Sequence, residues 1–139
     1  MTEASALAEL LSAEHQAIWA YGVIGAHLDE ERRTTALAAY DAHRLLRDSL
    51  LARMRSRGLP TPGPALAYEM TVTTPGSAVQ QAILLEDGLT ARWHDLVAST
   101  ENRDLRALAV RALSDAAVRA TRWRISARVR PATVPLPGT

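Results

Sequence analysis

Residues 10–28 read LLSAEHQAIWAYGVIGAHL, and the inward positions of this stretch and of the residues before it recur at alternating steps of four and three. These positions are Leu7, Leu11, Glu14, Ile18, Tyr21, Gly25 and Leu28. Such spacing is typical of the buried face of a helix in a bundle. Glu14 lies in the middle of this face, where a carboxylate loses its water and needs a cation, a hydrogen-bond donor or a proton. The stretch therefore predicts a helical bundle with a charged group near its centre.

Length and composition limit what the chain can be. Its 139 residues suit one domain, and the absence of cysteine excludes disulfides, thiolate metal sites and cysteine nucleophiles. The N-terminus lacks the basic and apolar regions of a signal peptide, and no segment reaches the roughly 18 apolar residues of a membrane span. We therefore expect a soluble, cytoplasmic protein with no membrane partner.

The rest of the chain predicts three more helices and one long connection. The first helix should run from a cap at Thr2 to about Leu28, and the second should end before Gly58. Residues 58–74 show no helical period and can span a helix of about 40 Å, so they predict a crossover that makes the second and third helices parallel. Thr74 with Pro75, and Asn102, should begin the last two helices.

This organisation predicts an all-α four-helix bundle over residues 1–130 and a mobile, proline-rich tail over residues 131–139. The inward positions expected on the second helix are Leu37, Tyr40, His43 or Arg44, Arg47, Leu50 or Leu51, and Met54. Those on the third are Val79, Ala82, Glu86, Leu89, Trp93 and Leu96. Those on the fourth are Leu105, Leu108, Ala112, Asp115, Val118 or Arg119, Arg122 and Val129. Each helix thus has a polar residue near its midpoint.

The two halves of the chain resemble each other. Aligning Glu14 with Glu86 places Tyr21 over Trp93, each seven residues after its acid. The second helix of each half aligns as well, through the pairs Tyr40 and Asp115, His43 and Val118, Arg44 and Arg119, and Arg47 and Arg122. Two helical hairpins joined by a crossover are therefore expected to surround one polar centre.

This arrangement resembles the ferritin-like superfamily, whose di-metal members carry one Glu on each of the first and third helices and Glu-x-x-His on each of the others. The segments EHQAIWAYGVIGAHL, AHRLLRDSL and LEDG with DAAVRATRWR are more narrowly similar to an uncharacterised ferritin-like family of high-GC bacteria. The resemblance implies a ferritin-like bundle in which Glu14 and Glu86 match the single glutamates. The other motifs are altered to Tyr40-x-x-His43 and Asp115-x-x-Val118.

Two hypotheses explain what compensates the charges of the buried acids. In one, Glu14, His43, Glu86 and Asp115 hold iron or manganese, and the protein is a metal-dependent oxidoreductase. In the other, a core polar network replaces the metal, with Tyr40, Arg44, Arg47, Arg119 and Arg122 as its members. Arg44 and Arg119 each follow a motif's first residue by four positions and so share its helix face. We favour the network, and with it a degenerate metal site, no cofactor, and a non-catalytic binding or structural role.

Charge and surface composition bear on partners. Residues 103–130 are rich in arginine, but Arg119 and Arg122 are expected inside the bundle and the acidic first helix can balance the others, which disfavours nucleic-acid binding. The alanine-rich faces outside the seams predict a homodimer.

Overall fold

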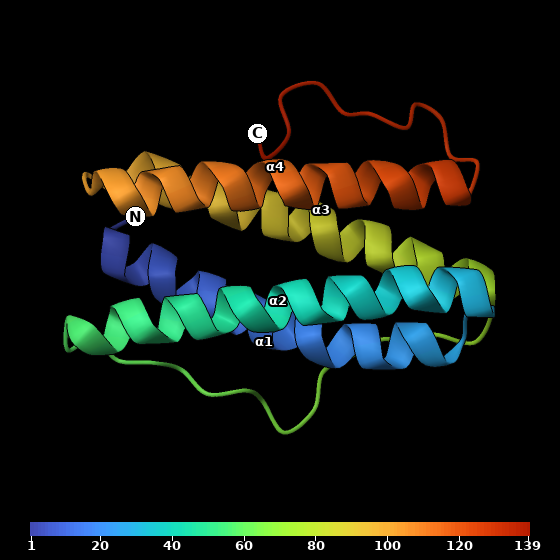
Figure 1. Cartoon of the computed structure of the whole chain (residues 1–139), viewed down its shortest axis with the longest axis horizontal. Coiled ribbons are helices and arrows are strands. Elements are labelled where there is room, and N and C mark those ends of the chain that lie inside the picture. Colours follow the sequence, from blue (N-terminus) through green and yellow to red (C-terminus); the bar gives the residue numbers. More distant parts are fainter.

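The computed structural model describes residues 1–139 and contains four helices and no strand. These are α1 (Glu3–Ala26), α2 (Glu30–Ser56), α3 (Pro75–Ser99) and α4 (Arg103–Ser126). Figure 1 shows them side by side in one bundle, with the crossover of residues 57–74 returning along its full length. As a result α2 and α3 run parallel, and α1 and α3 run antiparallel (Figure 1). The predicted all-α bundle with a long crossover is confirmed.

Side chains predicted to cap the helices do so. Thr2 and Thr74 each accept a hydrogen bond from the backbone of a serine three residues later, at 3.1 and 3.0 Å, and each serine hydroxyl bonds back to complete a capping box. Asn102 caps α4 by accepting from Leu105 N at 2.9 Å. Gly58 has a φ of +66°, the left-handed conformation that ends a helix, directly after the C-cap of α2. The first helix ends two residues before the predicted position, at Ala26.

The inward faces of α1 and α3 agree with the sequence pattern. All six predicted inward residues of α3 are buried, and on α1 every predicted one is buried except Ile18, which is half-buried. Helix α1 packs against both α2 and α3, and α3 packs against α4. Helices α1 and α3 are therefore the pair to which the other two helices attach, α2 to α1 and α4 to α3.

The predicted inward faces of α2 and α4 are partly wrong. Leu37 is 58% exposed, and Asp115, Arg122 and Val129 are exposed as well. At two positions where the sequence left a choice, His43 is buried while Arg44 is exposed, and Arg119 is half-buried while Val118 is 47% exposed. The residues of α4 that are buried are Leu105, Ala109, Ala112, Ala116, Ala120 and Trp123. Alanine side chains allow close approach of two helices, so the middle of α4 packs against the bundle through its smallest residues, between the buried Leu105 and Trp123 near its two ends.

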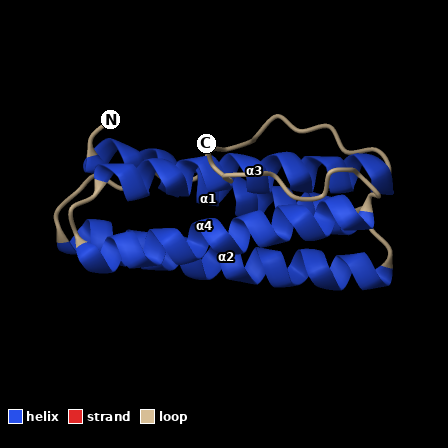
Figure 2. Ribbon diagram, turned by 90° about the horizontal axis from the view of Figure 1, so that it is seen from above, coloured by secondary structure: helices blue, strands red, loops and turns tan.

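Both irregular segments lie against the helices. The crossover is attached to α1, where His15 Nε2 lies 3.1 Å from Pro62 O and the Trp19 and Tyr68 rings are 5.4 Å apart. Figure 2 shows the C-terminal segment returning over the bundle to end near its middle. Gly138 has a φ of +89°, and a Cβ there would lie 2.9 Å from Thr90 O, so only glycine fits this contact. Mobility of the tail stays a prediction.

None of the helices combines the length and the apolar character that crossing a membrane requires.

The cap of α3 provides a test of the fold. Thr74→Ala removes the hydroxyl that accepts from Ser77 N, so the free energy of unfolding in urea should fall by about 1 kcal/mol. The neighbouring Thr73 makes no side-chain hydrogen bond, and Thr73→Ala is the matched control with little expected effect. Equal losses for the two variants would contradict the assigned start of α3.

Candidate functional site

Three of the predicted site residues meet at the centre of the bundle. Glu14 from α1, His43 from α2 and Glu86 from α3 are each 0% exposed. His43 Nδ1 lies 2.7 Å from Glu14 Oε2, and His43 Nε2 lies 2.8 Å from Glu86 Oε1. The imidazole therefore stands between the two carboxylates and joins three helices.

Two aromatic side chains donate further hydrogen bonds to the two acids in an exchanged pattern. Trp93 Nε1 donates to Glu14 Oε1 at 3.2 Å, and the Tyr21 hydroxyl donates to Glu86 Oε1 at 2.7 Å. Each acid thus receives a hydrogen bond from the aromatic residue that follows the other acid by seven positions. This exchange follows from the antiparallel packing of α1 and α3, because two turns along one helix lead back to the partner's acid. Trp123 Nε1 extends the network from α4 by donating to the Tyr21 hydroxyl at 3.1 Å.

Arg119 brings a second cation to the cluster. Its Nε donates to Glu86 Oε1 at 3.0 Å, and the arginine side chain is only 17% exposed. Glu86 Oε1 therefore receives three hydrogen bonds, from His43, Tyr21 and Arg119. Two other buried atoms of the same pair, Glu86 Oε2 and Arg119 Nη2, have no hydrogen-bond partner in the protein.

The two carboxylates keep His43 protonated. Burial opposes the charged imidazolium and is the largest single effect on it. The hydrogen bonds and charges of Glu14 and Glu86 together outweigh burial and raise the pKa of His43 to about 9. At neutral pH the centre holds two carboxylates, one imidazolium and one guanidinium, so its charges balance.

The same contacts set the protonation of Glu86 and Tyr21. Burial favours the neutral acid of Glu86, but the contacts with His43, the charge of Arg119 and the Tyr21 hydroxyl outweigh it and lower the pKa of Glu86 below its usual value. Burial and the adjacent Glu86 charge raise the pKa of Tyr21 well above its usual value. Tyr21 therefore remains a neutral donor, and Glu86 remains a carboxylate over the physiological range.

Other predicted site residues lie outside this cluster. Asp115 is exposed on α4, so the expected convergence of a third carboxylate is wrong. Tyr40 is half-buried, and the exposed Arg44 lies over its ring with 5.6 Å from Cζ to the centroid. Arg47 pairs with its neighbour Asp48, and Arg122 is exposed. Of the predicted arginine pair, only Arg119 reaches an acid, whereas Arg44 is exposed and lies over Tyr40. Asp115 faces outward because α4 packs through its alanine face.

The sequence pattern predicts Tyr21 and Trp93 only as inward positions, and it predicts no role at the site for them or for Trp123. The seven-residue offset of an aromatic donor from each acid was visible in the repeat. The repeat alone does not show that α1 and α3 run antiparallel in a register that brings each aromatic residue to the acid of the other helix.

The cluster does not fit a bound metal ion in this arrangement. No group of three or more His, Cys, Asp or Glu side chains is placed to hold one. A metal needs a lone pair from one imidazole nitrogen and carboxylates that converge on a single point. Here the two ring nitrogens of His43 face different carboxylates, and Arg119 lies against Glu86.

The protonation of His43 predicts a pH dependence of stability. Because the pKa is about 9 in the folded protein and 6.5 as the reference, the stabilisation is complete below pH 6.5 and is lost as the pH rises through 9. The free energy of unfolding in urea should fall by about 3 kcal/mol over this range. His43→Gln should remove the slope, and His94→Gln should keep it. If the variant fails to fold, NMR titration of His43 in the native protein decides, and a midpoint near 6.5 would refute the assignment.

The two arginines predicted as equivalent should behave differently. Arg119→Leu leaves Glu86 with one cation fewer in the core and should lower the free energy of unfolding by about 3 kcal/mol. Arg44→Leu is the matched control, and because Arg44 is exposed it should cost less than about 1 kcal/mol. Urea unfolding of both variants measures the difference, and similar losses would contradict the role given to Arg119.

Comparison with known proteins identifies relatives of this arrangement without a described activity. A solved structure of a conserved hypothetical protein, rv2844, from Mycobacterium tuberculosis is 30% identical, with a TM-score of 0.87 over 89% of this chain and 96% of that chain. No curated protein matches the sequence. The model of a family described as a domain of unknown function (DUF4439) matches residues 6–139. The chain therefore belongs to the DUF4439 family.

Proposed function

We propose that the chain is a ferritin-like protein with a degenerate metal centre, and that it acts as a non-catalytic binding or structural protein. The observation that carries this proposal is the position of His43, whose two ring nitrogens each face a buried carboxylate. In a ferritin-like di-metal centre the equivalent acids face metal ions. Here an imidazolium and a guanidinium compensate them, so the acids are retained in a different chemical role.

The structural part of this role is the alignment of the helices. Hydrogen bonds and ion pairs of the cluster join α1, α2, α3 and α4 through Glu14, His43, Glu86 and Arg119. Directional bonds between buried groups break if a helix slides or rotates, whereas alanine faces tolerate such shifts. The cluster therefore supports one register of a bundle whose α4 packs mainly through small residues.

A second candidate function is a metal-dependent oxidoreductase using iron or manganese. The observation in its favour is that Glu14, His43 and Glu86 are metal-binding side-chain types that meet in the core, where His43 lies 2.7 Å from Glu14 and 2.8 Å from Glu86. It would require His43 to lose a proton and turn, and it would lack Asp115, which lies on the surface. The homodimer and the cytoplasmic location remain predictions alongside either function.

Elemental analysis separates the two functions. Protein expressed in iron- and manganese-replete medium should carry far less metal than one ion per chain, and a chelator should leave the melting temperature unchanged. The physical reasons are that the cluster's charges are already balanced without a metal and that His43 lies between Glu14 and Glu86, so the two acids do not converge on one point.

The opposite result would promote the oxidoreductase. Metal bound in a stoichiometric amount, lost in Glu86→Ala and retained in Glu101→Ala, would overturn the proposed degenerate centre. Glu101 is a suitable control because it is an exposed glutamate in the connection between α3 and α4, away from the cluster.

A further inference from the structure

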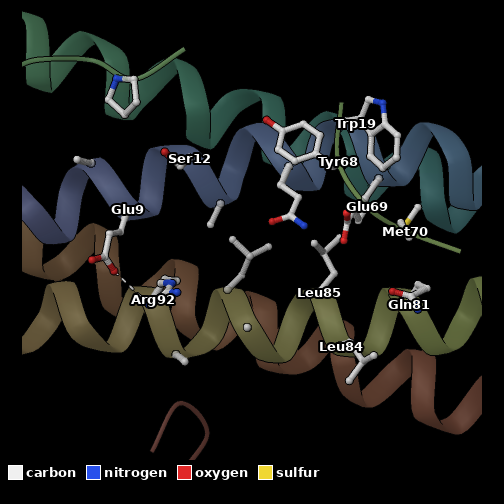
Figure 3. Close-up of a pocket in the computed structure, with 18 residues that line it drawn as sticks. Glu9, Ser12, Trp19, Tyr68, Glu69, Met70, Gln81, Leu84, Leu85 and Arg92 are labelled. Atoms are coloured by element: carbon white, nitrogen blue, oxygen red, sulfur yellow. Dashed lines mark hydrogen bonds and ion pairs between the residues drawn. The ribbon is translucent and has the colours of Figure 1, made fainter. Parts of the chain in front are cut away.

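A groove of about 900 Å³ runs between α1, α3 and the crossover. It lies apart from the charge cluster formed by Glu14, His43, Glu86 and Arg119. Its apolar lining includes Ala13 on α1 and Leu84, Leu85 and Leu89 on α3, and none of Glu14, His43 or Glu86 lines it. Gly88 also lines it, and a Cβ there would meet nothing within 4 Å, so the groove has open space over α3 at this point. Figure 3 shows side chains from three segments facing this space.

One end of the groove carries charges that cancel. Arg92 Nη1 lies 3.1 Å from Glu9 Oε2 across the α1–α3 boundary, and it is also 3.9 Å from Asp95. This arginine is the only cationic side chain that lines the groove, and its charge is already shared by two acids. A ligand with a negative charge would have to compete with both of them.

The other end is an aromatic corner. The rings of Trp19 and Tyr68 are 5.4 Å apart at 49°, and Met70 lies beside them in the lining. Tyr68 is held in place because its hydroxyl accepts a hydrogen bond from Ala65 N at 2.9 Å. Trp19 is still 36% exposed, so aromatic surface remains open to a ligand.

Glu69 adds an uncompensated negative charge to this corner. It lies on the crossover next to Tyr68, is exposed, and makes no hydrogen bond or ion pair within the protein. Figure 3 shows its carboxylate among Trp19, Tyr68 and Leu85, at the opposite end of the groove from the Glu9–Arg92 pair. Aromatic faces and a free carboxylate together attract a cation, and more strongly where the site excludes some of the water.

We propose that this groove binds a small organic cation with an apolar body. The cationic head lies at the corner formed by Trp19, Tyr68 and Glu69, and the apolar body lies along Leu84, Leu85 and Gly88 of α3. This site goes beyond the proposed structural role of the core. Because the groove shares no residue with the charge cluster, a test of the groove does not depend on whether the cluster binds a metal.

Hexyltrimethylammonium tests the charge requirement, with hexyl sulfate and hexanol as probes of the same chain length. Calorimetric titration should find that the ammonium binds at least about tenfold more tightly than either of the others, since only it gains both the aromatic and the carboxylate attraction. Equal binding of the three would mean a merely apolar groove and would overturn the proposal. Tighter binding of the sulfate would overturn it as well.

Variants locate the head group. Glu69→Gln should weaken binding of the ammonium about three- to tenfold and leave the binding of hexanol unchanged. The matched control Glu101→Gln removes an exposed acid outside the groove and should change neither affinity. Trp19→Leu should weaken the ammonium more than hexanol. Unchanged ammonium binding in both Glu69→Gln and Trp19→Leu would refute the corner as the site.

A second copy of the chain is the competing occupant of the groove. Light scattering over a range of protein concentrations, with and without hexyltrimethylammonium, measures whether the chain forms a dimer and whether the ligand changes it. A dimer that Gly88→Leu disrupts and that blocks ammonium binding would overturn the ligand site in favour of self-association. A monomer that binds the ammonium supports the proposal.

Discussion

The protonated imidazole of His43, held between two fully buried carboxylates, is the interaction on which the rest of the bundle depends. A carboxylate without water or a partner is one of the most unfavourable groups a core can contain, and this core contains two. One imidazolium bonded through both nitrogens compensates both acids at once, and Arg119 supplies the second positive charge. The favourable energy lies in the complete set, because removal of any member leaves an unpaired charge in a region of low dielectric constant.

This constraint explains features of the helices that contribute no charge. Tyr21 and Trp93 must lie two turns from the acids on their own helices so that each can reach the acid of the antiparallel partner. Arg119 lies at the edge of the buried face of α4, and its long side chain reaches inward to Glu86. The alanine face formed by Ala112, Ala116 and Ala120 brings α4 close enough for this contact. The small side chains of α4 and the length of the arginine are therefore two parts of one arrangement.

Residues of this site that interrupt an apolar period could be predicted from the sequence, whereas contacts set by the packing of helices could not. Glu14 and Glu86 could be predicted because each interrupts a strong apolar period, and on α3 large residues such as Leu89 and Trp93 fix the phase of that period. The weaker period of α2 predicted only that His43 or Arg44 faces inward. Helix α4 has no such large residue near its middle. Its buried alanines carry little hydrophobic signal, while the bulkier Val118 and the acid Asp115 suggested a face that is in fact exposed. The antiparallel register that exchanges the aromatic donors depends on tertiary packing and is not encoded in any single segment.

A metal could bind at this centre only if His43 gave up its proton and moved. The position of the His43 ring opposes this more strongly than its affinity for the proton does. With a pKa of about 9, removing the His43 proton at pH 7 costs about 3 kcal/mol. Structural metal ions in proteins bind with about 10 to 16 kcal/mol, so the proton alone would not keep a well-coordinated metal out. The stronger barrier is that the ring lies between Glu14 and Glu86, so the acids cannot converge on one point until it moves. Such a movement would break both imidazole hydrogen bonds before any metal–ligand bond had formed, and it would leave Arg119 as the only cation beside two buried carboxylates.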